Sequence, residues 1–270
     1  MSPRAWPGVL GKDLAMNVHA AELAQTGQSP DQLRARAGYY RLLAGAFIEE
    51  PGRDYLIALR SKEVQAELHD LGVRFDPDVT DTDVDTLVSE LACEYAALFT
   101  SPGGCPPIES ARLSGRLQQT AFEQVRAAYA QAGFKVRQGR FTLFEDQLGV
   151  ELSFVAALLD RLAAARKADD LDSAKHLEKE IKRFWALHLG LWVRGYARLL
   201  ERVTVHSFYR EIAALLGTFA EAELELIGVH VDDVDGGREV VPKADIPLEF
   251  NPDEPVCGGC RGPDSDSAVA

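Results

Sequence analysis

Apolar residues recur at intervals of three and four through most of residues 29–229, and this spacing is typical of one face of an α-helix. The first helix is predicted to begin after Ser29. Pro30 suits a first helical position, and Gln32 can return the hydrogen bond of an N-cap serine. The helix should continue until Pro51. Its predicted buried stripe consists of Leu33, Ala37, Tyr40, Ala44 and Phe47.

The same periodicity predicts further helices, and no strand alternation appears before residue 229. The predicted fold class is therefore all-α, a single helical-bundle domain over residues 29–229. The central buried helix should begin at Asp146, and the segment 171–203 should form one long helix or two helices joined near His188. The other predicted helices are a short pair within 53–72, one opened by Thr82 and Asp85, one over 113–132 that ends at Gly133, and a last one over 206–229.

The two ends of the chain differ in composition from this helical domain. Residues 1–28 are predicted to form a flexible N-terminal segment. Residues 230–270 form a tail in which ten Asp and Glu residues stand against three Lys and Arg, with several prolines and glycines. Such a segment buries too little apolar surface to order itself alone. We expect an acidic tail that is flexible or lies as an extended strip on the helical body.

Composition and charge narrow the class of partner. The formal net charge is −13 and the pI is near 4.9, which argues against binding to nucleic acid, because that binding depends on Lys and Arg. An acidic surface suits a cationic partner or serves solubility alone. No apolar run is long enough to span a membrane, and the N-terminus lacks a secretory pattern, so the expected location is the cytoplasm.

Candidate chemistry is sparse. The chain carries none of the phosphate-loop, dinucleotide, nucleophile-elbow or zinc-protease motifs. Its histidines are scattered singly, and His188 and His206 are interpreted as core-edge or surface residues. A hydrolytic carboxylate pair could combine Glu109 with Glu145 or Asp146, although the sequence does not give their separation. Enzymatic activity is therefore the weaker hypothesis.

The tail contains one pattern with metal or redox chemistry. Cys257 and Cys260 have C-x-x-C spacing, which suits two thiolates on one metal ion or reversible thiol chemistry. A closed metal site needs two more ligands, and no second C-x-x-C exists. A metal- or thiol-dependent redox or binding protein is the alternative function, while the main prediction includes no metal and no cofactor.

A loop with the sequence SPGGCPPIESARL, residues 101–113, carries the more informative carboxylate, Glu109. Tyr95 and Phe99 end the helix before it, and Asp146 lies at the start of the central helix. Carboxylates on loops and at helix starts accept bidentate bonds from Arg, and nearby aromatic residues could provide an apolar groove. The pattern predicts a site for a peptide that carries arginines followed by an apolar stretch. The plainer interpretation is that Asp146 caps its own helix.

Three stretches, taken in order, resemble the TorD/DmsD/NarJ-like family of redox-enzyme maturation chaperones. They are EYAALFTSPGGCPPIES, EDQLGVELSFVAALL and the Trp-rich segment that begins FWALHLGLW. The likeness covers roughly residues 33–228. The chain departs from the family pattern at Ile108, where Tyr is usual, and at Gln147, where His is usual.

The resemblance implies an all-helical, cytoplasmic, non-enzymatic chaperone. Its partner would be the immature catalytic subunit of a molybdopterin-containing oxidoreductase, or the twin-arginine signal peptide of that subunit. The chaperone would assist insertion of the molybdenum cofactor before export, as a monomer or homodimer without nucleic acid. Carried over by position, the peptide- or client-binding residues would be Glu109, Ser110, Asp146, Gln147 and Leu148, with Tyr95 and Phe99 shaping the floor.

Overall fold

The protein was analysed as a computed structural model, which describes residues 28–136 and 143–239. Within these ranges the chain is helical, with two single π-helical turns and no strand, so the all-α prediction is confirmed for this part. The elements are α2 (Pro30–Phe47), α3 (Arg53–Leu59), α4 (Lys62–Asp70), α5 (Pro77–Thr80), α6 (Val84–Tyr95), η1 (Ala96–Thr100), α7 (Glu109–Ser114), α8 (Thr120–Gln131), α9 (Leu148–Lys167), α10 (Leu171–Phe184), η2 (Trp185–Leu189), α11 (Gly190–Val203) and α12 (Ser207–Ile227).

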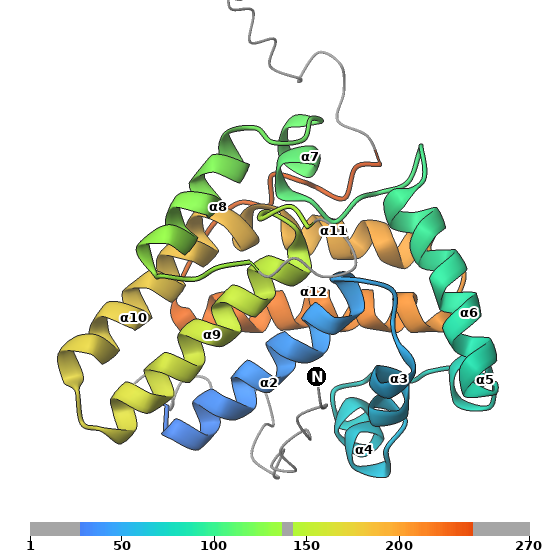
Figure 1. The fold of residues 1–270 in the computed structure, drawn as a ribbon, viewed down its shortest axis with the longest axis horizontal. Helices are drawn as coiled ribbons and strands as arrows, with labels where there is room; N and C mark the ends of the chain where they lie inside the picture. Colours follow the sequence, from blue (N-terminus) through green and yellow to red (C-terminus); the bar gives the residue numbers. More distant parts are fainter. Residues whose placement is uncertain (1–27, 137–142, 240–270) are drawn as a thin grey trace, which may run out of the picture.

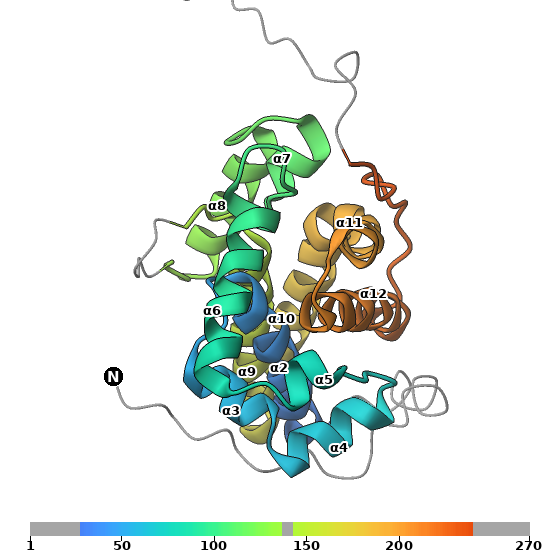
Figure 2. The ribbon, with the colours of Figure 1, turned by 90° about the vertical axis from the view of Figure 1, so that its right-hand side faces the viewer.

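The bundle is built around two helix pairs. Helices α2 and α9 lie side by side through the middle of the molecule, and α11 packs along α12 (Figure 1). The short helices α3 to α6 gather at one end, whereas α7 and α8 lie near the junction of α10 and α11 (Figures 1 and 2). The helices described here extend from Pro30 to Ile227. Residues 1–27 of the predicted N-terminal segment and most of the predicted tail, including Cys257 and Cys260, lie outside the described residues.

Helix α2 begins as the sequence predicts. Ser29 is its N-cap, its hydroxyl accepts a hydrogen bond from the Gln32 backbone, and the Gln32 side chain accepts one from the Ser29 backbone. This reciprocal pair satisfies two N–H groups that have no partner within the helix. The α-helix ends at Phe47, three residues before the predicted end. Leu33, Ala37, Tyr40, Ala44 and Phe47 are all buried, as predicted.

Two predicted helix boundaries are wrong. The segment predicted as one helix over 113–132 is divided into α7 and α8, and α7 already begins at Glu109 within the predicted loop. Gly115 ends α7 in the left-handed region, with φ 74°. Glycine adopts that conformation without the steric cost of a Cβ atom, so it stops the helix despite the continuing apolar pattern. Helix α6 is capped by Asp83 and not by Thr82.

The predicted junction near His188 corresponds to the π-helical turn η2. Helix α10 runs directly into η2, and η2 runs directly into α11, so residues 171–203 form one continuous helical rod with an irregular turn. Single π turns inside helices are rare and often occur at functional sites. This turn places the side chains of Trp185 and His188 in the interior.

A buried polar network ties α2, α12 and η2 together. The Arg36 guanidinium on α2 donates to the Glu223 carboxylate on α12, with an Nε–Oε1 distance of 2.7 Å. Tyr40 donates to the same carboxylate at 2.6 Å, and the Trp185 indole N–H donates to the Tyr40 hydroxyl at 2.7 Å. Arg36 is 7% exposed and Glu223 is 4% exposed. Charges buried to this degree are tolerated because each is paired and hydrogen-bonded.

The crossing of α2 and α9 depends on Gly149. A Cβ atom at this position would lie 2.8 Å from the Ile48 backbone nitrogen and 2.9 Å from the Ala44 carbonyl oxygen. Backbone atoms at these distances can yield only if the two helices move apart. We expect Gly149→Ala to lower the free energy of unfolding by about 1–2 kcal/mol, within the usual range for overpacking. Urea unfolding followed by circular dichroism measures the effect.

Gly38, on α2, the helix that α9 crosses, provides the matched control for Gly149. No atom lies within 4 Å of a Cβ atom built there. Alanine also has the higher helix propensity. Gly38→Ala should therefore be neutral or stabilising. Equal losses of stability in both variants would contradict the role of Gly149 in the helix crossing.

No helix in the described ranges is long and apolar enough to cross a membrane.

Candidate functional site

The two predicted site segments meet in space. Residues 105–109 and 144–148 run past each other, and Ile108 and Gln147 form an isolated antiparallel bridge. The Glu109 N–H donates to the Asp146 carbonyl at 2.9 Å, and the Leu148 N–H donates to the Pro107 carbonyl at 2.8 Å. Helices α7 and α9 therefore begin side by side. The two departures from the family pattern, Ile108 and Gln147, are direct neighbours.

Asp146 caps a different helix from the one expected. Its Oδ2 accepts a hydrogen bond from the Ser110 backbone N–H at 2.9 Å, in the first turn of α7. The N-cap of α9 is Gln147, whose Oε1 accepts from the Val150 N–H at 3.1 Å. The interpretation that Asp146 caps its own helix is therefore wrong. Asp146 fastens the loop helix α7 to the start of the central helix, and it is fully buried.

Gln147 and Tyr95 act on the end of α2. The Gln147 Nε2 and the Tyr95 hydroxyl both donate to the Phe47 carbonyl, the latter at 3.0 Å. Carbonyl groups in the last turn of a helix lack intrahelical partners, and these side chains supply them. The Phe99 ring packs edge-on against Tyr95, with ring centres 4.9 Å apart. Tyr95 and Phe99 thus support the α2 end of the site, and Leu148 is fully buried beside it.

The carboxyl group of Glu109 contacts the imidazole ring of His188. The His188 Nδ1 lies 3.0 Å from Oε2 and 3.2 Å from Oε1 of Glu109. Glu109 is 1% exposed and His188 is 3% exposed, so the pair is almost fully enclosed. The sequence pattern predicts a core-edge or surface position for His188, whereas the structure places it in the interior. The π turn η2 carries it there.

Glu151 completes a cluster of buried carboxyl groups and was missed from the sequence. It lies on α9, is fully buried, and makes no hydrogen bond of normal geometry through either oxygen. Burial raises the pKa of Glu151 well above its usual range, and the neighbouring Glu109 and Asp146 carboxylates raise it further. A signal was present in the sequence. Glu151 falls on the apolar stripe of Leu148, Leu152 and Val155 and is the only charged residue among them.

Asp146 experiences the same kind of environment. Burial raises the pKa of Asp146, and repulsion from Glu109 adds to this, although hydrogen bonds from Ser110 oppose the shift. Ser110 is itself fully buried. Three carboxyl groups and one imidazole thus share a site from which water is excluded. Because Glu109 and Asp146 are enclosed, a substrate cannot reach between them in this conformation, which disfavours the hydrolytic-pair hypothesis.

The burial also bears on the predicted clamp for a cationic peptide. Glu109 and Asp146 already bind His188 and Ser110, so a guanidinium from another molecule would have to displace these contacts and open both loops. In this conformation, the two residues position α7, α9 and η2.

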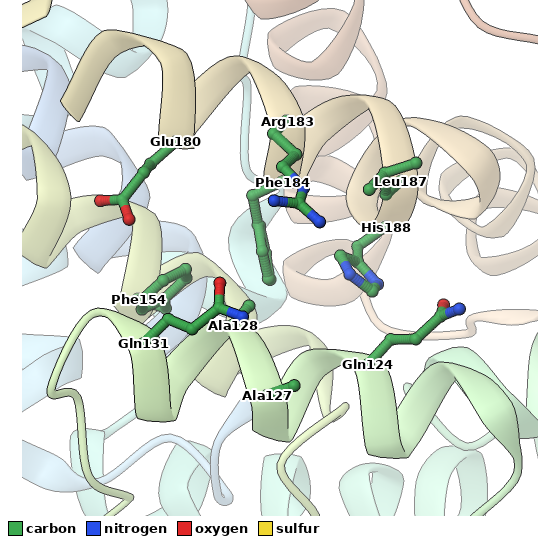
Figure 3. A pocket seen from close by; sticks show the side chains of 10 residues that line it. All are labelled: Gln124, Ala127, Ala128, Gln131, Phe154, Glu180, Arg183, Phe184, Leu187 and His188. Carbon is green, nitrogen blue, oxygen red and sulfur yellow. The ribbon is translucent and has the colours of Figure 1, made fainter. Parts of the chain in front are cut away.

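A pocket lies next to the carboxyl cluster. It has a volume of about 190 Å³ and opens between α8 on one side and α10 with η2 on the other. The side chains of the two walls face each other across the gap, and Phe154 of α9 lies between them beside Gln131 (Figure 3). His188 lines this pocket and also contacts Glu109, so it joins the pocket to the cluster. The remaining lining residues are Gln124, Ala127, Ala128, Gln131, Glu180, Arg183, Phe184 and Leu187.

The chemistry of the pocket is mixed. Phe154 and Phe184 provide an apolar floor, and Leu187, which is 49% exposed, extends it to the surface. Amide groups and one charge of each sign form the rim. Pockets with apolar floors and a few polar groups at the edge suit binding of an apolar side chain with a defined orientation.

The remaining candidates for chemistry contribute nothing to this site. Among the residues that the structure describes, no group of three or more His, Cys, Asp or Glu residues is arranged to hold a metal ion. Cys93 is an exposed free thiol and Cys105 a buried one. Burial raises the pKa of Cys105 to about 11, which disfavours the reactive thiolate. Cys257 and Cys260 lie outside the described residues, so the metal- or thiol-dependent alternative stays a prediction.

Comparison with protein families decides the general class. The family model described as nitrate reductase delta subunit matches residues 58–198, about half of the chain. The chain belongs to this family. Neither a search of curated proteins nor one of solved structures found a match.

The family consists of chaperones for the maturation of molybdoenzymes, which confirms the general function that the resemblance implied. The matched range contains both site loops, the His188 turn and every residue that lines the pocket. It stops before α12. The finer resemblance to the TorD and DmsD branches and the identity of the client are not decided by this match.

Proposed function

We propose that this protein is a cytoplasmic chaperone that holds the immature catalytic subunit of a molybdopterin-containing oxidoreductase. It would bind a segment of that subunit or its twin-arginine leader, and release it once the cofactor has been inserted. Membership of the nitrate reductase delta subunit family carries this proposal. The protein supplies binding energy and no chemistry, so the client needs lower affinity for the chaperone in its mature state than in its immature state.

The site residues have two roles in this proposal. The pocket between α8 and α10–η2 takes an apolar side chain of the client. Glu109, Ser110, Asp146, Gln147 and Leu148 hold the helices that form the pocket, with Tyr95 and Phe99 supporting α2. The burial of Glu109 and Asp146 supports a positioning role, and the partly exposed Leu187 and Arg183 suit direct contact. Direct ion pairs from client arginines to Glu109 and Asp146 belong to a state with both loops open.

The first test is co-purification of the full chain from its native cells, followed by mass spectrometry. A molybdopterin oxidoreductase subunit among the bound proteins is the expected result. Synthetic leader peptides then separate recognition of the leader from recognition of the body. A peptide with paired arginines should bind more tightly than one with lysines in their place if the leader is read, because Arg forms bidentate pairs that Lys does not. Absence of any such subunit would overturn the proposed function.

The pocket is tested by filling it. Ala127 lines the pocket from α8 and is exposed, so a larger side chain there projects into the gap without disturbing the core. We expect Ala127→Trp to weaken client binding at least about ten-fold, a change of about 1.4 kcal/mol. The matched control is Ala130→Trp, on the same helix but outside the pocket. Equal binding by both variants would show that the client docks elsewhere.

A further inference from the structure

The chain after α12 forms a strap across the molecule. Gly228 ends α12 in the left-handed region, and residues 231–238 then run along the outer side of α11 towards α7 (Figure 2). The strap, defined as residues 231–238, hydrogen-bonds to α11 through its backbone. The Val234 and Asp235 N–H groups both donate to the Leu191 carbonyl, at 2.7 and 3.2 Å. The predicted tail is therefore an extended strip on the helical body over this range.

Three arginines of α11 bind the strap through hydrogen bonds and an ion pair. Arg194, Arg198 and Arg202 follow one another at intervals of four and thus form a row along one side of the helix. Arg194 donates to the Val231 carbonyl at 2.6 Å. Arg198 forms an ion pair with Asp233, and Arg202 donates to the Gly237 carbonyl. We call this row the arginine ladder.

The surface of α11 next to the ladder is shaped for a close-lying backbone. A Cβ atom at Gly195 would lie 2.7 Å from the Asp235 Oδ1 and from the backbone nitrogens of Gly236 and Gly237. No side chain fits at that position while the strap is in place. The strap in turn has two glycines at positive φ, 63° and 73°, where it turns above Gly195. Helix and strap are thus complementary in shape as well as in charge.

A fourth arginine binds the end of the strap from α7. The Arg112 Nε lies 2.6 Å from the Asp235 Oδ2, and both side chains are buried, at 5% and 0% exposed. Arg112 also donates to the Arg238 carbonyl. A buried ion pair is costly to break, because one charge is left without a partner. Removal of the strap therefore requires another carboxylate at Arg112.

Apart from the Arg112–Asp235 pair, the contacts of the strap can be replaced by those of another acidic segment at low cost. Val234 is 50% exposed, and neither Val231 nor Val234 packs against the hydrophobic core. Segments with few buried apolar contacts open locally at low free-energy cost. The Arg198–Asp233 pair is half exposed on the arginine side, so salt screens it. An acidic competitor could supply the same contacts, including the carboxylate that Arg112 needs.

The positive charge of the arginine ladder contrasts with the negative net charge of the chain. The formal net charge is −13, yet four arginines converge on one extended strip whose own sequence is Val-Asp-Asp-Val-Asp-Gly-Gly-Arg. We propose that the strap is a built-in competitor, and that the arginine ladder with Arg112 is a docking site for an extended acidic segment of another polypeptide. Such a segment carries two carboxylates at alternate positions followed by small residues. This site is separate from the pocket beside His188.

The test uses the full chain and a labelled peptide, VDDVDGGRE, which has the sequence of residues 231–239. In the variant Asp233→Asn/Asp235→Asn the strap loses the two carboxylates that pair with arginines and should leave the ladder. Fluorescence anisotropy should then report binding of the peptide at least about ten-fold tighter than to the unchanged chain. Binding should weaken as salt rises. A peptide with Asn in place of each Asp should not bind.

Two controls isolate the ladder. Asp232 is exposed, so Asp232→Asn removes one of the two charges that the double variant removes without freeing the ladder, and it should bind the peptide as the unchanged chain does. Adding Arg198→Ala and Arg202→Ala to the double variant should abolish binding. Because Asp235→Asn also removes the partner of buried Arg112, Asp233→Asn alone is tested in parallel. It should give a smaller gain, of about three-fold.

Three results would overturn the proposal. The first is equal peptide binding by the double variant and the unchanged chain, while circular dichroism shows that both are folded. The second is binding that persists after both ladder arginines are removed. The third is a dimer, detected by light scattering, in which the strap of the unchanged chain crosses to a second copy, because the occupant would then be this protein itself.

Discussion

Replacing Glu223 by alanine is expected to lower the free energy of unfolding by about 3–5 kcal/mol, the usual loss when one member of a buried ion pair is removed. The substitution leaves the Arg36 guanidinium buried without its carboxylate, and it removes the acceptor of the Tyr40 hydroxyl. Arg36 cannot relieve the cost by losing its proton, because an arginine guanidinium stays protonated in proteins. Urea unfolding at pH 7.5, followed by circular dichroism, measures the loss.

The matched double variant is Arg36→Met with Glu223→Leu. It removes both charges and keeps apolar volume at each position. Replacement of a buried pair by apolar residues is often neutral or stabilising, so the double variant should recover most of the loss. Tyr40 keeps one partner, the Trp185 indole. A double variant as unstable as Glu223→Ala would show that packing, and not the unpaired charge, determines the cost.

Replacing Glu151 by glutamine is expected to stabilise the protein at alkaline pH. In the unfolded chain a glutamate ionises near its ordinary pKa of about 4.3. In the folded protein the raised pKa lets Glu151 keep its proton to higher pH. Between these two values the folded state binds more protons than the unfolded state, so stability falls as pH rises. Glutamine is never ionised and removes this dependence.

The difference between the two proteins should therefore grow with pH. At pH 8 we expect Glu151→Gln to be more stable by about 1–3 kcal/mol, comparable to the cost of an unsatisfied buried polar group. Carboxylates with a lowered pKa, such as Asp78 and Asp170, affect stability only in acid. Asp146, whose pKa is also raised, is present in both proteins, so the difference between their stabilities in urea at pH 5.5, 7 and 8.5 reports Glu151. Equal slopes against pH in both proteins would contradict the assignment.

An exposed glutamate serves as the control for the pH experiment. Glu225 lies on α12 with its side chain in solvent. Glu225→Gln makes the same chemical change, and surface substitutions of this kind usually stay within about 0.5 kcal/mol. Its stability should follow the unchanged protein across the whole pH range.

Local features of the sequence predicted most of the fold. Ser29 and Gln32 fixed the start of α2, because capping requires only residues three positions apart. Apolar periodicity located α9 and α12, because it too depends only on residues that are close together in the sequence. Gly115 was harder to interpret, since the apolar pattern continues through it, and only its left-handed backbone separates α7 from α8.

The site was harder to predict because its contacts join distant parts of the chain. The sequence placed Glu109 and Asp146 in one predicted site without giving their separation, and it could not tell that Asp146 caps α7. The Glu109–His188 pair joins residues 79 positions apart. Periodicity indicates that a residue faces inward, and it does not indicate what it faces. Glu151, in contrast, can be identified from the sequence, since a single acidic residue on an apolar stripe is visible from spacing alone.

The π turn η2 has a consequence for how this chain tolerates insertion and deletion. A π turn contains more residues than an α turn, so it shifts the direction of every side chain that follows it in the rod formed by α10 and α11. Deleting one residue within 185–189 would restore regular α geometry with α11 facing much as it does now. If the same five residues were instead wound as a regular α-helix, α11 would be rotated by about 100° relative to α10. His188 would then turn away from Glu109, and Arg198 would turn away from the strap. The one extra residue of the π turn thus determines the direction of both the face that carries His188 and the face that carries Arg198.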